Sequence, residues 1–157
     1  MESSFELLNI KMITAVNKKF AIGKNGKLPW HCKEDLNFFK KTTLGKTILV
    51  GSKTKASLPN LPGREVVTLS RNPLKGNFTS SQEVLSSFRD KELWIAGGSE
   101  VYLEFIKYTK ELIISHIDDD SDGDAFFPIS EIQHNFKNPP KLLLQGESMK
   151  VYRYERS

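Results

Sequence analysis

The stretch GKNGKLPW at residues 23–30, with Asp35 five residues further on, is the most informative part of the chain. Two glycines three residues apart allow the backbone to bend, Pro29 fixes a backbone angle, and Trp30 adds a large apolar ring with one N–H donor. Residues 34–41 (EDLNFFKK) predict a short helix with Asp35 in its first turn, where the helix dipole favours a negative charge.

Asp35 is expected to face the interior of the molecule. Asp35 and Phe39 lie four residues apart and therefore share one face of the predicted helix, and Phe39 should point inward. A carboxylate on an apolar face beside a flexible loop is a candidate proton donor or ligand clamp. Taken alone, Asp35 is better explained as a solvated carboxylate at a helix N-terminus.

Length and composition predict a soluble, cytoplasmic protein of one domain. The chain has 157 residues, of which 38% are hydrophobic and 27% charged. It lacks an apolar run of the roughly 20 residues that span a membrane, and residues 1–6 do not resemble a secretory signal. One cysteine, Cys32, excludes an internal disulfide framework and fits a reducing compartment.

The net charge of +4 permits an anionic partner without naming one. The basic residues are scattered, and no basic helix or arginine-rich block predicts a nucleic-acid partner. A positively biased cleft for a small polyanion is equally compatible with this charge.

The order of predicted elements indicates an α/β fold. Strands are predicted at residues 12–16, 47–50, 66–70, 93–96, 111–117, 141–145 and 151–155. Helices are predicted at residues 34–41, 53–58, 81–88 and 100–108. We expect an N-terminal extension over residues 1–11, then one domain over 12–157 with a mostly parallel sheet of about eight strands, an antiparallel C-terminal edge and about four flanking helices.

The ligand site is expected at the carboxyl ends of the parallel strands, where open α/β sheets bind their ligands. The loop after Val16, Gly51, Ser70 and the pair Gly97-Gly98 all fall at such ends. These four segments should therefore surround one site.

Two motifs are set aside, and no metal site is predicted. Residues 118–123 (DDDSDG) match half of a calcium-binding loop, but its twelfth position is Ile129 instead of glutamate. Gly45-Lys46-Thr47 resembles the end of a phosphate-binding loop, yet it precedes a strand and lacks the first glycine. The three histidines show no metal-ligand spacing.

Taken in order along the chain, these features resemble dihydrofolate reductase from about residue 12 to the C-terminus. The matching residues are Ile22-Gly23, Leu28-Pro29-Trp30, Asp35 with Phe38-Phe39, Thr43, Gly51, Thr54, Leu61-Pro62-Gly63-Arg64, Leu69-Ser70-Arg71, Gly97-Gly98 with Val101-Tyr102, Ser115-His116-Ile117-Asp118, and Gly123-Asp124 with Phe127-Pro128. Each motif is modest alone, but their shared order and spacing make chance agreement improbable.

The resemblance implies a dihydrofolate-reductase-like fold and the NADPH-dependent reduction of 7,8-dihydrofolate to tetrahydrofolate. A hydride passes to C6 of the pterin while N5 gains a proton. Asp35 would bind the pterin and favour protonation at N5, and a closed, dry pocket should raise its pKa. Residues 23–28 would close over the ligands. The implied partners are dihydrofolate and antifolate inhibitors, and a monomer is expected.

The resemblance also implies a set of site residues. Catalysis would involve Leu28, Trp30, Asp35 and Ser115. The substrate would contact Ile13, Ala15, Asp35, Leu36, Phe39, Leu58, Leu61, Arg64, Tyr102 and Ser115, with Arg64 pairing with the glutamate-tail carboxylate. The cofactor would contact Ala15, Ile22, Gly51, Ser52, Lys53, Thr54, Leu69, Ser70, Arg71, Ala96, Gly97, Gly98, Ser99, Val101 and Tyr102. The family commonly has a cis peptide between the glycines that match Gly97 and Gly98.

Four positions depart from the family pattern, one of them Lys55, where the family often has tryptophan. Ser52 stands where the family often has arginine, and Glu100 where it is often basic, so recognition of the cofactor's 2′-phosphate would depend on Lys53 and Arg71. Ala96 replaces a larger aliphatic residue, which should widen the pocket. Two alternatives stay open: a reductase of the same fold acting on another pterin or a pyrimidine, and a non-catalytic binding protein on this scaffold.

Overall fold

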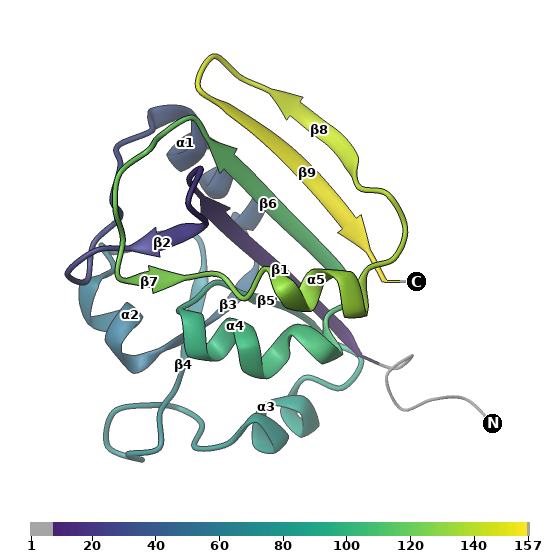
Figure 1. Cartoon of the computed structure of the whole chain (residues 1–157). Helices are drawn as coiled ribbons and strands as arrows, with labels where there is room; N and C mark the ends of the chain where they lie inside the picture. The colour runs from purple at the N-terminus through teal and green to yellow at the C-terminus, as the bar shows by residue number, and fades with distance from the viewer. Residues whose placement is uncertain (1–7, 157) are drawn as a thin grey trace.

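Strands and helices alternate along most of the chain, and in the computed structural model, which describes residues 8–156, the strands build one twisted central sheet (Figure 1). The strands are β1 (Asn9–Val16), β2 (Ala21–Gly23), β3 (Thr47–Gly51), β4 (Glu65–Leu69), β5 (Glu92–Ile95), β6 (Glu111–Ile117), β7 (Ala125–Phe126), β8 (Lys141–Gln145) and β9 (Met149–Glu155). The helices are α1 (Lys33–Thr43), α2 (Ser52–Ser57), α3 (Ser81–Ser87), α4 (Ser99–Phe105) and α5 (Ser130–Asn135), with a 3₁₀ helix, η2, at Ile106–Tyr108.

The central sheet has the strand order β4-β3-β5-β1-β6-β9-β8. The first five strands are parallel, and β9 pairs antiparallel with both β6 and β8. The predicted mostly parallel sheet with an antiparallel C-terminal edge is therefore confirmed. The sheet has seven strands, one fewer than expected, because β2 and β7 pair with each other in a separate two-stranded sheet.

One predicted boundary needs correction, and one short helix was not predicted. The described residues contain the four predicted helices and a fifth, the six-residue α5. The first strand begins at Asn9, so residues 9–11 belong to the sheet and not to an extension. Lys11 interrupts the apolar run in the sequence, but its ammonium pairs with Glu92 while Ile10 is fully buried. The rest of the predicted extension, residues 1–7, lies outside the described residues.

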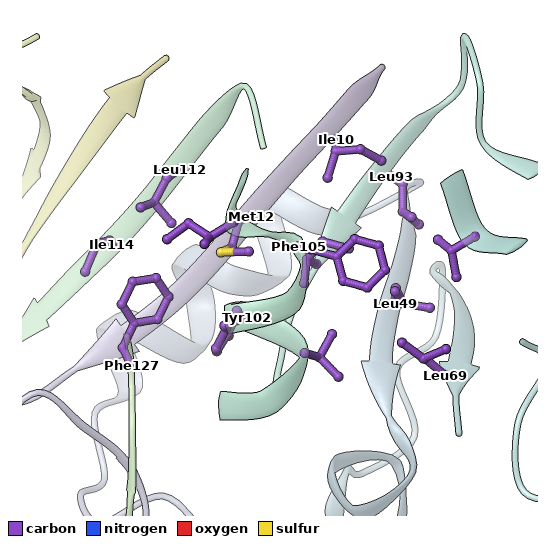
Figure 2. Packing of buried hydrophobic residues seen from close by; sticks show 14 of the residues in the cluster. Ile10, Met12, Leu49, Leu69, Leu93, Tyr102, Phe105, Leu112, Ile114 and Phe127 are labelled. Atoms are coloured by element: carbon purple, nitrogen blue, oxygen red, sulfur yellow. The ribbon is translucent and has the colours of Figure 1, made fainter. Parts of the chain in front are cut away.

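Apolar side chains cover both faces of the sheet. On one face Phe105 of α4 packs among Ile10 and Met12 of β1 and Leu93 of β5 (Figure 2). On the other face Phe38 and Phe39 of α1 pack against a second cluster, which comprises Ile13, Trp30, Cys32, Trp94, Ile113, Ile117, Met149 and Val151. In the described part of the chain, no helix is long and apolar enough to cross a membrane.

Candidate active site

A cavity of about 1400 Å³ opens at the carboxyl ends of β1, β3, β4 and β5. Its wall includes Gly51 at the end of β3, Ser70 after β4, Gly97–Gly98 after β5, and Ile22 and Gly23 from the segment after β1. These four segments therefore line one cavity, as the sequence predicts. The volume exceeds the roughly 300–1,000 Å³ of a typical single-ligand pocket.

Asp35 lines this cavity from the first turn of α1. Its side chain is buried, with the residue 8% exposed, and it is the only buried residue with a charged side chain between residues 8 and 156. Burial raises the pKa of Asp35 above its ordinary value, and the hydrogen bond from Ser115 on β6 partly opposes this shift. The predicted inward orientation of Asp35 is therefore confirmed.

Trp30 lines the same cavity and has an unsatisfied polar atom. The indole is buried, and its Nε1–H makes no hydrogen bond within the described part of the protein. Buried donors almost always have a partner, so a donor left free at a cavity wall is available to a ligand or to a water molecule. Trp30 can thus bind a polar group that enters the cavity.

The segment between β1 and α1 covers one side of the cavity. Lys24 and Lys27 exchange backbone hydrogen bonds of 2.7 and 3.0 Å around Asn25-Gly26, whose φ angles of 50° and 78° suit a tight hairpin turn. The Asn25 N–H donates to Asp124 Oδ2 at 2.9 Å. The two central turn residues are exposed, and Leu28, 48% exposed, lines the cavity.

The glycine-rich edge allows a close approach to the backbone. The peptide between Gly97 and Gly98 is cis, as the family resemblance implied, and Gly97 has a φ of 126° that favours glycine. A Cβ atom on Gly98 would lie 3.0 Å from Thr54 Oγ1, and one on Gly51 would lie 3.1 Å from Val101 Cγ2. Larger residues at these positions would crowd the cavity wall.

The mouth of the cavity beyond β3 and β4 is basic. Lys53, Arg71 and Lys75 line it with exposed side chains. None of the three forms a salt bridge within residues 8–156, whereas Lys11, Lys18, Lys19 and Lys46 all do. Their positive charge is therefore available to an anionic ligand.

Almost all of the predicted site residues lie together on this wall, and two do not. Ser115 is 1% exposed and lies behind Asp35. Arg64 is outside the cavity wall, where its Nε donates to Pro62 O at 3.2 Å and its Nη1 to Thr43 Oγ1 at 3.5 Å. Each proposed role stays a prediction, but the shared location of the other residues agrees with one site.

Sequence reasoning missed several residues of the site. Thr14, a buried polar residue in β1, lines the cavity and is hydrogen-bonded to Tyr102, whose hydroxyl also donates to Ile13 O at 2.8 Å. A threonine within an apolar strand was the available signal. Asp124 belonged to the matching Gly123-Asp124 motif but was given no role in the site, and Lys75 gave no signal, because a charged residue in a loop is ordinary.

Comparisons with known proteins agree with this geometry. A family model for dihydrofolate reductase matches residues 9–154. A dihydrofolate reductase from Buchnera aphidicola subsp. Acyrthosiphon pisum is 32% identical over 154 residues, covering 94% of this chain and 96% of that protein. One from Neisseria meningitidis serogroup B is 34% identical over 138 residues, covering 82% and 84%. The solved structure of dihydrofolate reductase from Enterococcus faecalis, complexed with NADP(H) and RAB-propyl, matches with a TM-score of 0.80 and 29% identity, covering 94% of this chain and 95% of that one.

Proposed function

Because the chain belongs to the dihydrofolate reductase family, we propose that it reduces 7,8-dihydrofolate to 5,6,7,8-tetrahydrofolate with NADPH and that Asp35 governs the proton gained by N5. The protein is an NADPH-dependent oxidoreductase. Two observations support the proton role of Asp35: it is the only buried carboxylate between residues 8 and 156, and it lines the large cavity.

The cavity fits a dinucleotide along its glycine-rich and basic side. NADPH, when bound, supplies the hydride. Gly51, Gly97 and Gly98 leave the wall open where a Cβ atom would crowd it. Lys53, Arg71 and Lys75 supply unpaired positive charge at the mouth, which suits phosphate groups. Lys75 thus joins the two cations that sequence analysis assigned to the 2′-phosphate.

Asp35 and Trp30 together account for the control of the proton. A carboxyl group whose pKa is raised by burial retains its proton to higher pH, which suits delivery of a proton to N5. The free Nε1–H of Trp30 can hold a polar group or a water molecule at the same wall. Ser115 orients the Asp35 carboxyl group from behind.

The other side of the cavity suits an aromatic substrate. Its wall is mostly apolar and comprises Ile13, Ala15, Leu28, Leu36, Phe39, Leu58, Pro59 and Leu61. Arg64 lies next to this region, and its guanidinium would have to leave Pro62 and Thr43 to pair with the glutamate tail. Arg64→Leu should weaken dihydrofolate far more than NADPH. Equal losses for both ligands would exclude this role for Arg64.

The proposed reaction is tested by following NADPH absorbance with purified protein and 7,8-dihydrofolate, with NADH in parallel. Rapid oxidation of NADPH is expected, and a slow rate with NADH would agree with recognition of the 2′-phosphate by the basic mouth. Tight NADPH binding without turnover of dihydrofolate, together with failure to bind methotrexate, would favour another pterin or a pyrimidine as the substrate. Absence of both binding and turnover would favour the non-catalytic alternative.

We further propose that the enzyme acts as a monomer in the cytoplasm. A single chain supplies Asp35, the glycine-rich edge and the basic mouth of the cavity, which supports this proposal. The thiol of Cys32 is free and buried, in keeping with a reducing compartment. Full activity in a size-exclusion peak of monomer mass is expected, and activity confined to a larger species would exclude the monomer.

A further inference from the structure

Glu34 is next to Asp35 in the first turn of α1 but does not line the cavity. Its carboxylate binds the turn between β8 and β9 instead. Oε1 accepts hydrogen bonds from the Ser148 N–H at 2.9 Å and from the Ser148 Oγ–H at 3.0 Å, and Oε2 accepts one from the Glu147 N–H at 3.1 Å. Two successive backbone N–H groups thus hold both oxygens of one carboxylate, which is a directional arrangement.

The β8–β9 turn is itself held in place. The Gly146 N–H donates to Met149 O at 2.8 Å, and Ser148 O accepts from the Asp118 N–H at 2.8 Å. Met149, the first residue of β9, is 3% exposed. A Cβ atom on Gly146 would lie 2.9 Å from the Cδ atom of Glu34, so glycine leaves the space that this carboxylate occupies.

The N-terminus of α1 has no side-chain cap. Its N-cap residue is Cys32, whose side chain makes no capping hydrogen bond. The Cys32 Sγ atom lies 3.7 Å from Ser148 Oγ, which brings the same turn against the N-terminus of the helix. Glu34 is therefore the residue that ties the first turn of α1 to the β8–β9 turn, while Asp35 of the same turn is bound to Ser115 of β6.

Asp35 and Glu34 are bound by two connected parts of the structure, namely strand β6, which pairs with β9, and the turn that leads into β9. Its hydrogen-bond partner Ser115 belongs to β6, and Ser115 is paired with Val151 of β9. The turn that holds Glu34 is continuous with β9, three residues before Val151. The β8–β9 turn thus binds α1 through Glu34, and β6, which is paired with β9, binds the Asp35 carboxyl group through Ser115.

We propose that Glu34 is a positioning residue, which through the β8–β9 turn holds the first turn of α1 so that Asp35 stays buried against Ser115. This inference rests on the function proposed for Asp35. If the tie is broken, the first turn of α1 becomes free to shift and water gains access to Asp35. Because burial is what raises the pKa of Asp35, its pKa should then fall toward the ordinary value.

The other titratable groups near Asp35 do not connect it to the β8–β9 turn. Tyr102 on α4 is coupled electrostatically to Asp35, and burial raises the pKa of its own hydroxyl, so it stays neutral. Lys27 and His31 line the cavity from the segment before α1. None of these three has a hydrogen bond to the β8–β9 turn in the described residues, so a variant of the turn leaves them in place.

Gly146→Ala tests the proposal most directly. The added methyl group displaces the Glu34 carboxylate, which is the flexible end of a side chain, while the charge of Glu34 is retained. Glu34→Ala removes both contact and charge, and Glu34→Gln retains one accepting oxygen. In Gly146→Ala and Glu34→Ala we expect kcat at neutral pH to fall by about 10-fold, below the roughly 10²-fold that a 1 Å misplacement can cost, with the KM for NADPH unchanged. Glu34→Gln should fall between these variants and the wild type.

The second measurement does not depend on turnover. Carboxyl ¹³C NMR titration, with the Asp35 signal assigned by its loss in Asp35→Asn, should show Asp35 titrating at lower pH in Gly146→Ala and Glu34→Ala than in the wild type. Glu147→Ala is the matched control, because it removes a carboxylate from the same turn but leaves the bound N–H; no shift is expected. Folded variants with wild-type kcat–pH profiles and an unmoved Asp35 titration would overturn the proposal. A wild-type protein without turnover would instead remove the proposed function, and the titration would still test the position of Asp35.

Discussion

Glu92 and Asp35 are carboxylates at opposite ends of the parallel strands, and their pKa values are shifted in opposite directions. Glu92 begins β5 and belongs to an amino-end cluster of Lys11, Lys46, Glu92, Trp94 and Glu111. Burial opposes ionisation of Glu92, but hydrogen bonds from Lys11, Lys46 and Trp94 outweigh it and lower the pKa of Glu92 to about 2. Asp35, at the carboxyl ends, has no salt bridge within residues 8–156, and burial raises its pKa.

The two tryptophans differ in the same way. Trp94 Nε1 donates to Glu92 Oε1 at 3.2 Å, whereas Trp30 Nε1 has no partner in the described structure. Both rings pack in the same apolar cluster, so burial alone does not distinguish them. Lys11, Lys46 and Trp94 satisfy the Glu92 carboxylate at the amino ends, while the Trp30 donor at the carboxyl ends remains available to a ligand.

Asp35→Asn should have the largest effect. An amide cannot supply the proton, so turnover at neutral pH should fall by about 10²-fold or more while NADPH binding is kept. Some activity should return at low pH, where the substrate is protonated in solution. Steady-state rates across pH measure the loss and recovery of turnover, and a fluorescence titration with NADPH measures cofactor binding. Glu92→Gln is the matched control at the other end of the strands and should retain its kcat. Normal turnover of Asp35→Asn at neutral pH would contradict the proton role.

Glu92→Gln should lower the stability of the protein, whereas Asp35→Asn lowers its activity. It weakens hydrogen bonds from two lysines, and we expect a loss of about 1–3 kcal/mol in the free energy of unfolding at neutral pH. Glu92 has a lowered pKa in the folded state, so its contribution is complete above the ordinary pKa of 4.5 and disappears as the pH falls through about 2. The free energies of unfolding of Glu92→Gln and of the wild type, measured by urea denaturation, should therefore converge as the pH falls from 4.5 to about 2. A constant difference across that window would show that the loss comes from packing and not from charge.

The sequence predicted the parallel sheet and the edge that carries the site. The apolar run at residues 47–50 marks a strand covered on both faces, and its carboxyl end, with those of β1, β4 and β5, locates the cavity. Asp35 was identifiable because helical spacing places it on the face of Phe39. These inferences need only short-range patterns, which a single sequence contains.

The tertiary pairs could not be predicted from the sequence. Lys11 looks like a break before the first strand, yet Glu92, 81 residues away, neutralises it and allows β1 to begin at Asn9. Glu34 looks like an ordinary helix-start carboxylate, yet its partners lie 113 and 114 residues further on. Such contacts depend on the register of distant strands, which local patterns do not determine.

Replacing each tryptophan by phenylalanine should separate the two ends further. Trp94→Phe removes a hydrogen bond to a charged group and should cost about 1.5–3 kcal/mol at most, with turnover retained. Trp30→Phe removes a donor that has no protein partner, so stability should change little while kcat falls. Thermal unfolding and initial rates, measured on both variants, test whether Trp94→Phe lowers stability and Trp30→Phe lowers kcat. Similar stability losses in both variants would mean that Trp30 Nε1 has a structural role after all.

The smallest effect expected is a gain in stability from Asp35→Asn at neutral pH. The pKa of Asp35 is raised in the folded state, so the stability associated with its protonated form is complete below the ordinary pKa of 3.8 and is lost as the pH rises through the folded pKa. Above that point the native protein holds a desolvated charge, and an amide of the same shape avoids this cost. The Tm of Asp35→Asn should exceed that of the wild type at neutral pH and match it below pH 3.8, because both side chains are then neutral. Equal Tm values at neutral pH would mean that the Asp35 carboxylate is solvated, and that the contrast with Glu92 reflects partners alone and not burial.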